Sequence, residues 1–212
     1  MPRRPAAAAV ATTMASMVAR LVLASGSPRR RELLESAGFE FEAIAPDVDE
    51  DSLPGESAAT MARRLSEAKA LAVAPDVDVS ACVLGCDTTI ALDGEVIGKP
   101  RDEDDALHTL MRMAGRTHDV ISGFCVVIGG EVRHSGEANS TVTMRPYGHD
   151  EALDYVLTGE PKDRAGSYAI QGLGRRLVAA YTGSFTNIMG LPLDAVVPVL
   201  DRLMATPVVD DA

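Results

Sequence analysis

The stretch Leu21-Val-Leu-Ala-Ser-Gly-Ser-Pro-Arg-Arg-Arg31 is typical of a short apolar strand, a tight turn and a helix whose first turn carries three arginines. Ser27 is a good N-cap, Pro28 suits the first helical position, and Gly38 suits the end of the helix. The N–H groups and dipole of a helix already make its N-terminus positive, so cations there are unfavourable unless an anion lies between them. The stretch therefore indicates either a phosphate-binding turn or a surface helix with solvated arginines.

The composition favours one acidic domain that handles small molecules. The chain has 212 residues and a formal net charge of −11, which argues against binding a nucleic acid polymer. We expect residues 20–206 to form a single domain. We expect residues 1–19 to be a disordered extension rather than a secretory signal, because their apolar part is mostly alanine and leads directly into the first strand.

Cysteine, histidine and hydropathy patterns exclude several other classes. The three cysteines are scattered and the histidines show no zinc-ligand spacing, which fits a cytoplasmic protein without a disulfide framework. No apolar run approaches the length that a membrane span needs, so we expect no membrane association.

Further along the chain, the hydrophobic patterns predict a mixed α/β fold without regular βαβ alternation. Strands are expected at residues 39–45, 82–92, 95–100, 120–128 and 131–144, and 185–191 looks extended. Helices are expected at 58–74, 102–114, 148–157 and 192–204. Residues 159–174 form a glycine-rich, charged segment whose composition is typical of a functional loop.

Three charged residues in these elements have unusual predicted positions. Lys69 lies one turn after Leu65, near the apolar stripe of its helix, and so either extends its ammonium to the surface or points into a cleft. The Asp-Gly turn at 93–94 predicts a hairpin whose register brings Asp87 and Lys99 together at its open end. Strand alternation puts their Cβ atoms on opposite faces, a conflict that a bulge or a strand end there would remove.

Carboxylates and cations recur at loops and element ends, in a combination that suits a phosphate compound handled with a hard metal ion. No P-loop and no nucleophile elbow is present. The candidate set is Arg29, Arg30, Glu50, Lys69, Asp87, Lys99, Lys162 and Arg164.

These residues fall within short motifs that occur in order along the chain. The motifs are Ala24-Ser-Gly-Ser-Pro-Arg-Arg30, Asp49-Glu50, Glu67-Ala-Lys69, Gly85-Cys-Asp-Thr88, Gly98-Lys-Pro100, Glu160-Pro161 with Asp163, Ala165-Gly166 and Tyr168, Ile170-Gln-Gly-Leu-Gly174, and Gly190-Leu-Pro-Leu193. Over residues 21–203 the chain resembles the Maf-type nucleoside triphosphate pyrophosphatases, a bacterial family named for septum formation.

The resemblance implies hydrolysis of a nucleoside triphosphate between its α and β phosphates, with Mg²⁺, Mn²⁺ or Co²⁺. It also implies an elongated, twisted mixed sheet flanked by helices, with two lobes around a central cleft as in Maf and inosine-triphosphatase-like folds, and often a homodimer. The alternative is a nucleotide-binding regulator of cell division without turnover. Such a binder is expected to have lost Asp87, Glu50 or Lys99, and this chain retains all three.

The resemblance also implies roles for individual residues. Asp87 would accept the proton of the attacking water and hold the metal with Glu50. Lys99, the second catalytic residue, would neutralise the triphosphate together with Arg30 and Lys69. The expected substrate-binding residues are Ser25, Ser27, Arg29, Arg30, Lys69, Thr88, Arg164 and Gln171.

Within that set, the combination of Arg29, Thr88 and Gln171 resembles the branch that acts on dTTP and UTP rather than on 7-methyl-GTP. Arg164 is a departure, because the family usually has lysine there. The change keeps the charge but replaces a compact donor with a planar fork.

Overall fold

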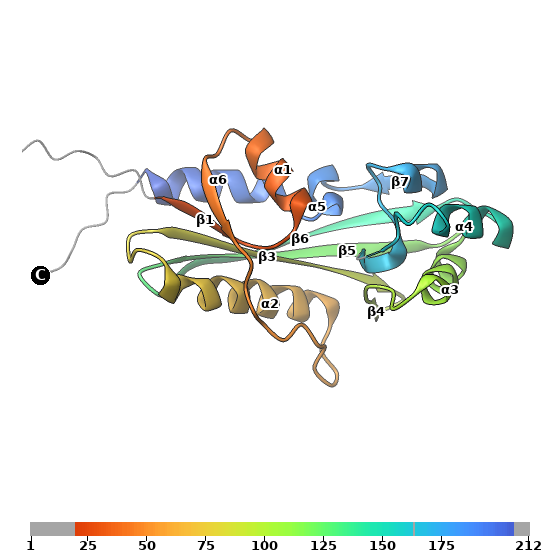
Figure 1. Cartoon of the computed structure of the whole chain (residues 1–212), viewed down its shortest axis with the longest axis horizontal. Helices are drawn as coiled ribbons and strands as arrows, with labels where there is room; N and C mark the ends of the chain where they lie inside the picture. Colours follow the sequence, from red (N-terminus) through yellow and green to blue (C-terminus); the bar gives the residue numbers. More distant parts are fainter. Residues whose placement is uncertain (1–19, 163, 206–212) are drawn as a thin grey trace, which may run out of the picture.

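A seven-stranded mixed sheet runs the length of the molecule and gives it an elongated shape (Figure 1). The computed structural model describes residues 20–162 and 164–205. The expectations for residues 1–19, for Asp163 and for the domain end at 206 lie outside these ranges.

The strands follow the order β2-β1-β3-β5-β6-β7, and β4 pairs with β3 off this path. β1 runs parallel to β2 and β3, whereas all other pairs are antiparallel. The prediction of a mixed α/β fold is therefore confirmed. The strands are β1 (Leu21–Ala24), β2 (Phe41–Ile44), β3 (Cys82–Leu92), β4 (Glu95–Ile97), β5 (Thr117–Ile128), β6 (Glu131–Met144) and β7 (Val178–Thr182).

Helices cover both faces of the sheet (Figure 1). The long helix α2 lies on one face, α1 and α6 lie on the other, and α3 and α4 lie at the far end near β4. The helices are α1 (Pro28–Ser36), α2 (Ala58–Val73), α3 (Glu103–Met113), α4 (His149–Val156), α5 (Phe185–Met189) and α6 (Leu193–Met204), with short 3₁₀ turns η1 (Ala74–Asp76), η2 (Ala165–Ser167) and η3 (Leu173–Leu177). In the described ranges, none of these helices has the length and apolar character needed to cross a bilayer.

Two glycines allow α2 to pack directly on the sheet. A Cβ atom at Gly85 in β3 would lie 2.1 Å from the carbonyl oxygen of Ser66, and one at Gly123 in β5 would lie 2.3 Å from that of Ala62. Both distances are far below van der Waals contact, so any larger residue would push the helix away. This close approach brings Lys69, which is buried on the inner side of α2, against β3.

The predicted hairpin forms, but its pairing is shorter than expected. Leu92 pairs with Glu95 across the Asp-Gly turn, and the described register ends at Ile90 opposite Ile97. Lys99 therefore lies beyond the end of β4. Because it is not part of the strand, the alternation of side chains does not prevent it from lying near Asp87.

Residues 178–191 differ from the prediction. Residues 185–191 are not extended, because Ser184 caps α5 by accepting from Asn187 N–H and Gly190, at a φ of 118°, ends the helix. The buried Asn187 side chain donates to the Val120 carbonyl at 2.9 Å, a contact that local propensity does not reveal. β7 was not predicted, since Val-Ala-Ala-Tyr-Thr shows no clear alternation.

Replacing Gly123 with alanine should destabilise the fold without changing any charged group. We expect Gly123→Ala to lower the free energy of unfolding by about 2 kcal/mol or more, because the new methyl group overlaps the α2 backbone. Gly98→Ala is the control, since its Cβ would meet nothing within 4 Å. Urea unfolding of both variants measures the difference, and equal stabilities would contradict the packing argument.

Acid should destabilise the protein through His118 in β5. The side chain is 2% exposed, its Nε2 lies 2.9 Å from the Tyr168 hydroxyl, and burial lowers its pKa from 6.5 to about 4. As the pH falls, the unfolded chain protonates near 6.5 while the folded chain resists until about 4, so stability is lost across this window.

Between pH 7 and pH 5 this difference amounts to about 2 kcal/mol. Unfolding curves at the two pH values should show that wild type loses about this much more stability than His118→Gln. Identical losses in the two proteins would show that His118 is not held neutral.

Candidate active site

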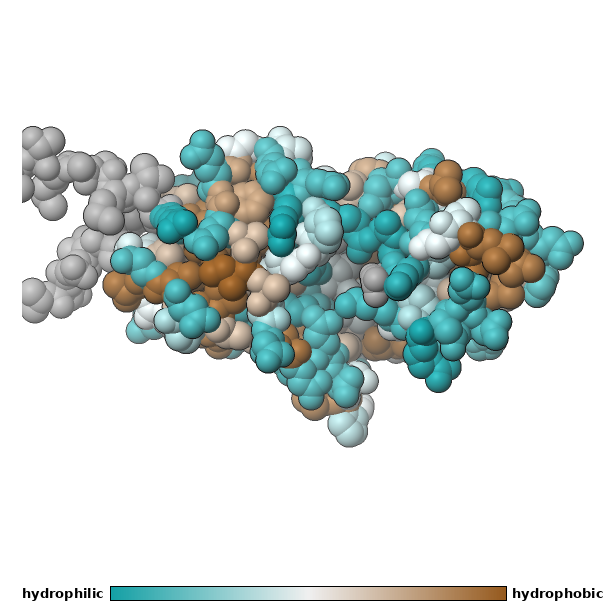
Figure 2. All heavy atoms as spheres, viewed as in Figure 1, coloured by the Kyte–Doolittle hydropathy of each residue, from teal (hydrophilic) through white to brown (hydrophobic). Residues whose placement is uncertain are grey.

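A cavity of about 950 Å³ opens on the sheet and brings together every site residue predicted from the sequence. Its walls come from the end of β1, the first turn of α1, the loop before α2, α2 itself, β3, β4 and the segment after it, β5, the glycine-rich segment and α5. The predicted residues that line it are Ser25, Ser27, Arg29, Arg30, Glu50, Lys69, Asp87, Thr88, Lys99, Arg164 and Gln171. Figure 2 shows mainly hydrophilic residues over the middle of the molecule and hydrophobic residues toward both ends, one group at the end that carries β1 and α6 and a smaller one at the end that carries α4.

On one side of the cavity, Lys69 joins two carboxylates. Its Nζ lies 2.6 Å from Asp87 Oδ1 and 2.5 Å from Glu50 Oε1. Lys69 and Asp87 are buried, whereas Glu50 is exposed. Lys69 thus points into a cleft, which was one of the two predicted alternatives.

The same cluster extends to Lys99 and Thr89. Lys99 Nζ lies 3.4 Å from Glu50 Oε2, and Thr89 Oγ1 donates to Asp87 Oδ2 at 3.4 Å. Among the described residues, the ion-pair partner of Asp87 is Lys69 rather than Lys99, although both lysines line the cavity. Burial alone would raise the pKa of Glu50, but the hydrogen bonds and charges of Lys69 and Lys99 lower it overall.

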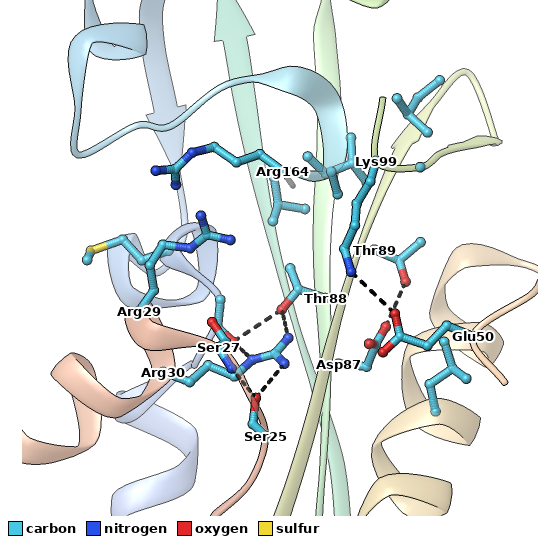
Figure 3. Close-up of a pocket in the computed structure, with 18 of the residues that line it drawn as sticks. Ser25, Ser27, Arg29, Arg30, Glu50, Asp87, Thr88, Thr89, Lys99 and Arg164 are labelled. Atoms are coloured by element: carbon cyan, nitrogen blue, oxygen red, sulfur yellow. Dashed lines mark hydrogen bonds and ion pairs between the residues drawn. The ribbon is translucent and has the colours of Figure 1, made fainter. Parts of the chain in front are cut away.

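On the other side, Arg30 is fixed by three acceptors from separate parts of the chain (Figure 3). Its guanidinium donates to the Gly190 carbonyl at 2.8 Å, to Thr88 Oγ1 at 3.1 Å and to Ser25 Oγ at 3.3 Å. Thr88 Oγ1 also lies 2.9 Å from Ser122 Oγ. The side chain of Arg30 is therefore positioned before any ligand arrives.

Two further arginines, Arg29 and Arg164, line the same cavity as Arg30 (Figure 3). Arg29 makes no hydrogen bond or salt bridge to any residue within 20–162 or 164–205, while Arg164 Nε donates to the Glu160 carbonyl at 2.7 Å. Burial and the positive charges of Arg164 and Arg30 lower the pKa of Arg29, against a smaller opposing effect of Glu32. Converging cations of this kind favour an anion such as phosphate.

The first turn of α1 adds to this positive region. Ser27 occupies the N-cap position, but its side chain makes no capping hydrogen bond, and no acidic residue lies in the first turn. The backbone N–H of Ser27 donates to Ser25 Oγ at 3.2 Å. The arginines of α1 thus lie at an electropositive helix end that faces a cavity, as the phosphate-binding alternative requires.

An apolar wall completes the cavity. Ile90, Val120, Tyr168 and Ile188 line it from β3, β5, the glycine-rich segment and α5. A cavity that combines such a wall with cations can take a ligand with a flat ring at one end and phosphates at the other.

Two residues that support the site, Thr89 and Ser122, were not predicted from the sequence. Thr89 lies two residues after Asp87, so strand alternation alone puts both on one face and could have identified it. Ser122 can be identified as a supporting residue only from the pairing of β3 with β5, in which it lies opposite Thr88.

The carboxylates are the groups that could hold a metal ion. Glu50 and Asp87 each present an oxygen within 2.6 Å of the same ammonium nitrogen, so their oxygens converge on one position. Within residues 20–162 and 164–205, no group of three or more His, Cys, Asp or Glu side chains could hold a metal. A metal at this position would therefore need further oxygens from water or from a ligand.

Several curated proteins are similar to this chain over most of its length. A dTTP/UTP pyrophosphatase of Nitratidesulfovibrio vulgaris is 45% identical over 86% of this chain and 87% of that protein. The dTTP/UTP pyrophosphatase of Vibrio cholerae is 44% identical over 83% of this chain and 94% of its own. That of Myxococcus xanthus is 46% identical over 86% and 91%, respectively.

A more distant likeness is found to a solved structure described as a nucleoside-triphosphatase, dITP/XTP pyrophosphatase, from Mycobacterium abscessus. It is 16% identical, covers 87% of this chain and 97% of that one, and has a TM-score of 0.42. The profile described as Maf-like protein matches residues 20–203. Together with the relatives at 44–46% identity, this match shows that the chain belongs to the Maf family.

Proposed function

We propose that this chain hydrolyses dTTP and UTP between the α and β phosphates, releasing the nucleoside monophosphate and pyrophosphate. The observation that carries the proposal is a single cavity that joins the Asp87, Lys69 and Glu50 cluster to three converging arginines. The curated relatives with 42–46% identity, all called dTTP/UTP pyrophosphatase, support this nucleotide class.

Cations on the two sides of the cavity are expected to bind different parts of the triphosphate. Arg30, already oriented by its three acceptors, is expected to hold phosphate oxygens together with the first turn of α1. Lys69 and Lys99 lie on the opposite side of the cavity and would neutralise charge there. A triphosphate spanning the two sides would place a phosphoanhydride bond near Asp87.

Asp87 is the group that would activate water. It takes a proton from a water molecule as the water oxygen forms a new bond to phosphorus. The bridging P–O bond then breaks, and the electron pair leaves with the departing phosphate oxygen, whose negative charge Lys69 or Lys99 stabilises. Monophosphate and pyrophosphate together account for all the atoms of the nucleotide and the water.

The two converging carboxylates fit a hard divalent cation, because Mg²⁺ commonly uses one or two carboxylates and takes its remaining oxygens from phosphates and water. Glu50 and Asp87 would hold it. When bound, the cation would neutralise phosphate charge and favour attack at phosphorus.

Three residues are proposed to set the nucleotide preference. Thr88 has its hydroxyl fixed by Arg30 and Ser122, Arg29 is free to contact a ligand, and Gln171 lines the cavity from the glycine-rich segment.

The expected cytoplasmic location and homodimeric state remain predictions.

Product analysis tests the proposal directly. Purified protein with Mg²⁺ should convert dTTP and UTP to monophosphate and pyrophosphate faster than it converts CTP, GTP or ATP. Asp87→Asn should lower kcat by about 10²–10⁴-fold and keep dTTP binding, because it removes the proton acceptor and preserves the shape of the side chain.

Asp104→Asn is the matched control, since this aspartate is exposed on α3 outside the cavity. Release of orthophosphate as the first product, or wild-type rates in Asp87→Asn, would contradict the mechanism. Binding of dTTP without hydrolysis would favour a nucleotide-binding regulator.

A further inference from the structure

The glycine-rich segment that carries Arg164, Tyr168 and Gln171 to the cavity has little regular structure of its own. Between the end of α4 and β7 it contains only the short turns η2 and η3 among its described residues. No strand pairing of the described segment holds these three side chains in place. Their positions must therefore depend on side-chain contacts.

Glu160 closes this segment into a loop. Its Oε1 accepts from the N–H of Leu173 at 3.0 Å, and its Oε2 accepts from the N–H of Gly174 at 2.9 Å. Its backbone carbonyl accepts from Arg164 Nε at 2.7 Å. One residue thus fixes both the far end of the segment and an arginine that faces the cavity.

Tyr155 ties the loop to α4. Its hydroxyl donates to Glu160 Oε2 at 2.8 Å and accepts from the N–H of Ala169 at 3.1 Å, and its side chain is fully buried. Ala169 lines the cavity, as do its sequence neighbours Tyr168 and Ile170. The hydroxyl therefore connects the middle of the loop to a helix through a contact that water cannot easily replace.

Glycines leave the room that these contacts need. A Cβ at Gly172 would lie 2.0 Å from Glu160 Oε1, and a Cβ at Gly174 would lie 2.6 Å from the Tyr155 hydroxyl. The run Gln171-Gly-Leu-Gly174 thus combines a residue that faces the cavity with two that must lack side chains.

An ionised carboxylate suits this position better than an amide. Burial on its own would raise the pKa of Glu160, but hydrogen bonds from Gly174, Tyr155 and Leu173 and the charge of Arg164 lower it overall. All of these partners are donors, and a carboxylate only accepts. A glutamine would have to turn its NH₂ group toward one of them.

We propose that Glu160 and Tyr155 are positioning residues for nucleotide binding, which hold the segment so that Arg164 and Gln171 face the phosphates and base. This inference rests on the proposed function. It assigns to Glu160 and Tyr155 no contact with the substrate.

Tyr155→Phe and Tyr147→Phe form a matched pair. Each removes one buried tyrosine hydroxyl from the same hydrophobic cluster, but Tyr147 donates to the Leu110 carbonyl in α3 and does not touch the segment. Tyr155→Phe should raise KM for dTTP by about five- to tenfold with a small change in kcat, and Tyr147→Phe should leave KM unchanged. Thermal unfolding of both variants checks that they lose similar stability.

Two further readouts separate positioning from general destabilisation. Gln171→Ala should raise KM less in the Tyr155→Phe background than in wild type, because both changes weaken the same contact between Gln171 and the nucleotide. In Glu160→Gln, hydrogen exchange at the amides of Ala169, Leu173 and Gly174 should become faster, while exchange in α2 stays the same.

Equal KM values in the two tyrosine variants, additive effects of Gln171→Ala, or unchanged exchange in Glu160→Gln would each overturn the inference. If wild type hydrolyses no nucleotide, the proposed function fails. The equilibrium dissociation constant of dTTP in the same variants then decides the positioning role, with the same ratios expected.

Discussion

The ion pair between Lys69 and Asp87 depends on how closely α2 packs against the sheet. Gly85 and Gly123 leave no space for a side chain between helix and strands, so the ammonium of a buried lysine reaches a carboxylate on β3 at 2.6 Å. Glu50 then approaches the same nitrogen from the loop before α2. The close packing of α2 on the sheet therefore also positions the Lys69, Asp87 and Glu50 cluster of the cavity.

The opposite half of the cavity is built by a different principle. Three arginines converge from α1 and the glycine-rich segment, and one of them is held by acceptors just after β1, on β3 and at the end of α5. The chain as a whole carries a net charge of −11, so this concentration of positive charge is local. A small polyanion can enter such a cavity, whereas the acidic remainder of the surface disfavours a nucleic acid polymer.

Much of the fold follows from local sequence patterns, and the exceptions have identifiable causes. The first strand, the α2 and α6 helices and the Asp-Gly hairpin were predicted because their periodicity or turn chemistry is strong. The α5 helix was wrongly predicted as extended. Its cap at Ser184 is local, but its anchor, the hydrogen bond from Asn187 to the Val120 carbonyl, joins residues distant in sequence. Helical spacing left the direction of the Lys69 side chain open, because it cannot distinguish a surface lysine from one that faces a cleft.

The site residues were named mostly from a family resemblance, and the structure brings all of them to one cavity. The support around them was not predictable in the same way. Ser122 is brought to Thr88 by strand register, and Glu160 reaches Leu173 and Gly174 across a loop. Such contacts join residues that no short sequence window contains.

A crystal structure of Asp87→Asn with dTTP and Mn²⁺ tests the central claim most directly, namely that one nucleotide spans both halves of the cavity. We expect phosphates held between Arg30 and Lys99, with the bridging oxygen between the α and β phosphates closest to residue 87. A triphosphate bound outside this cavity, or one whose β–γ bridge lies closest to residue 87, would contradict it.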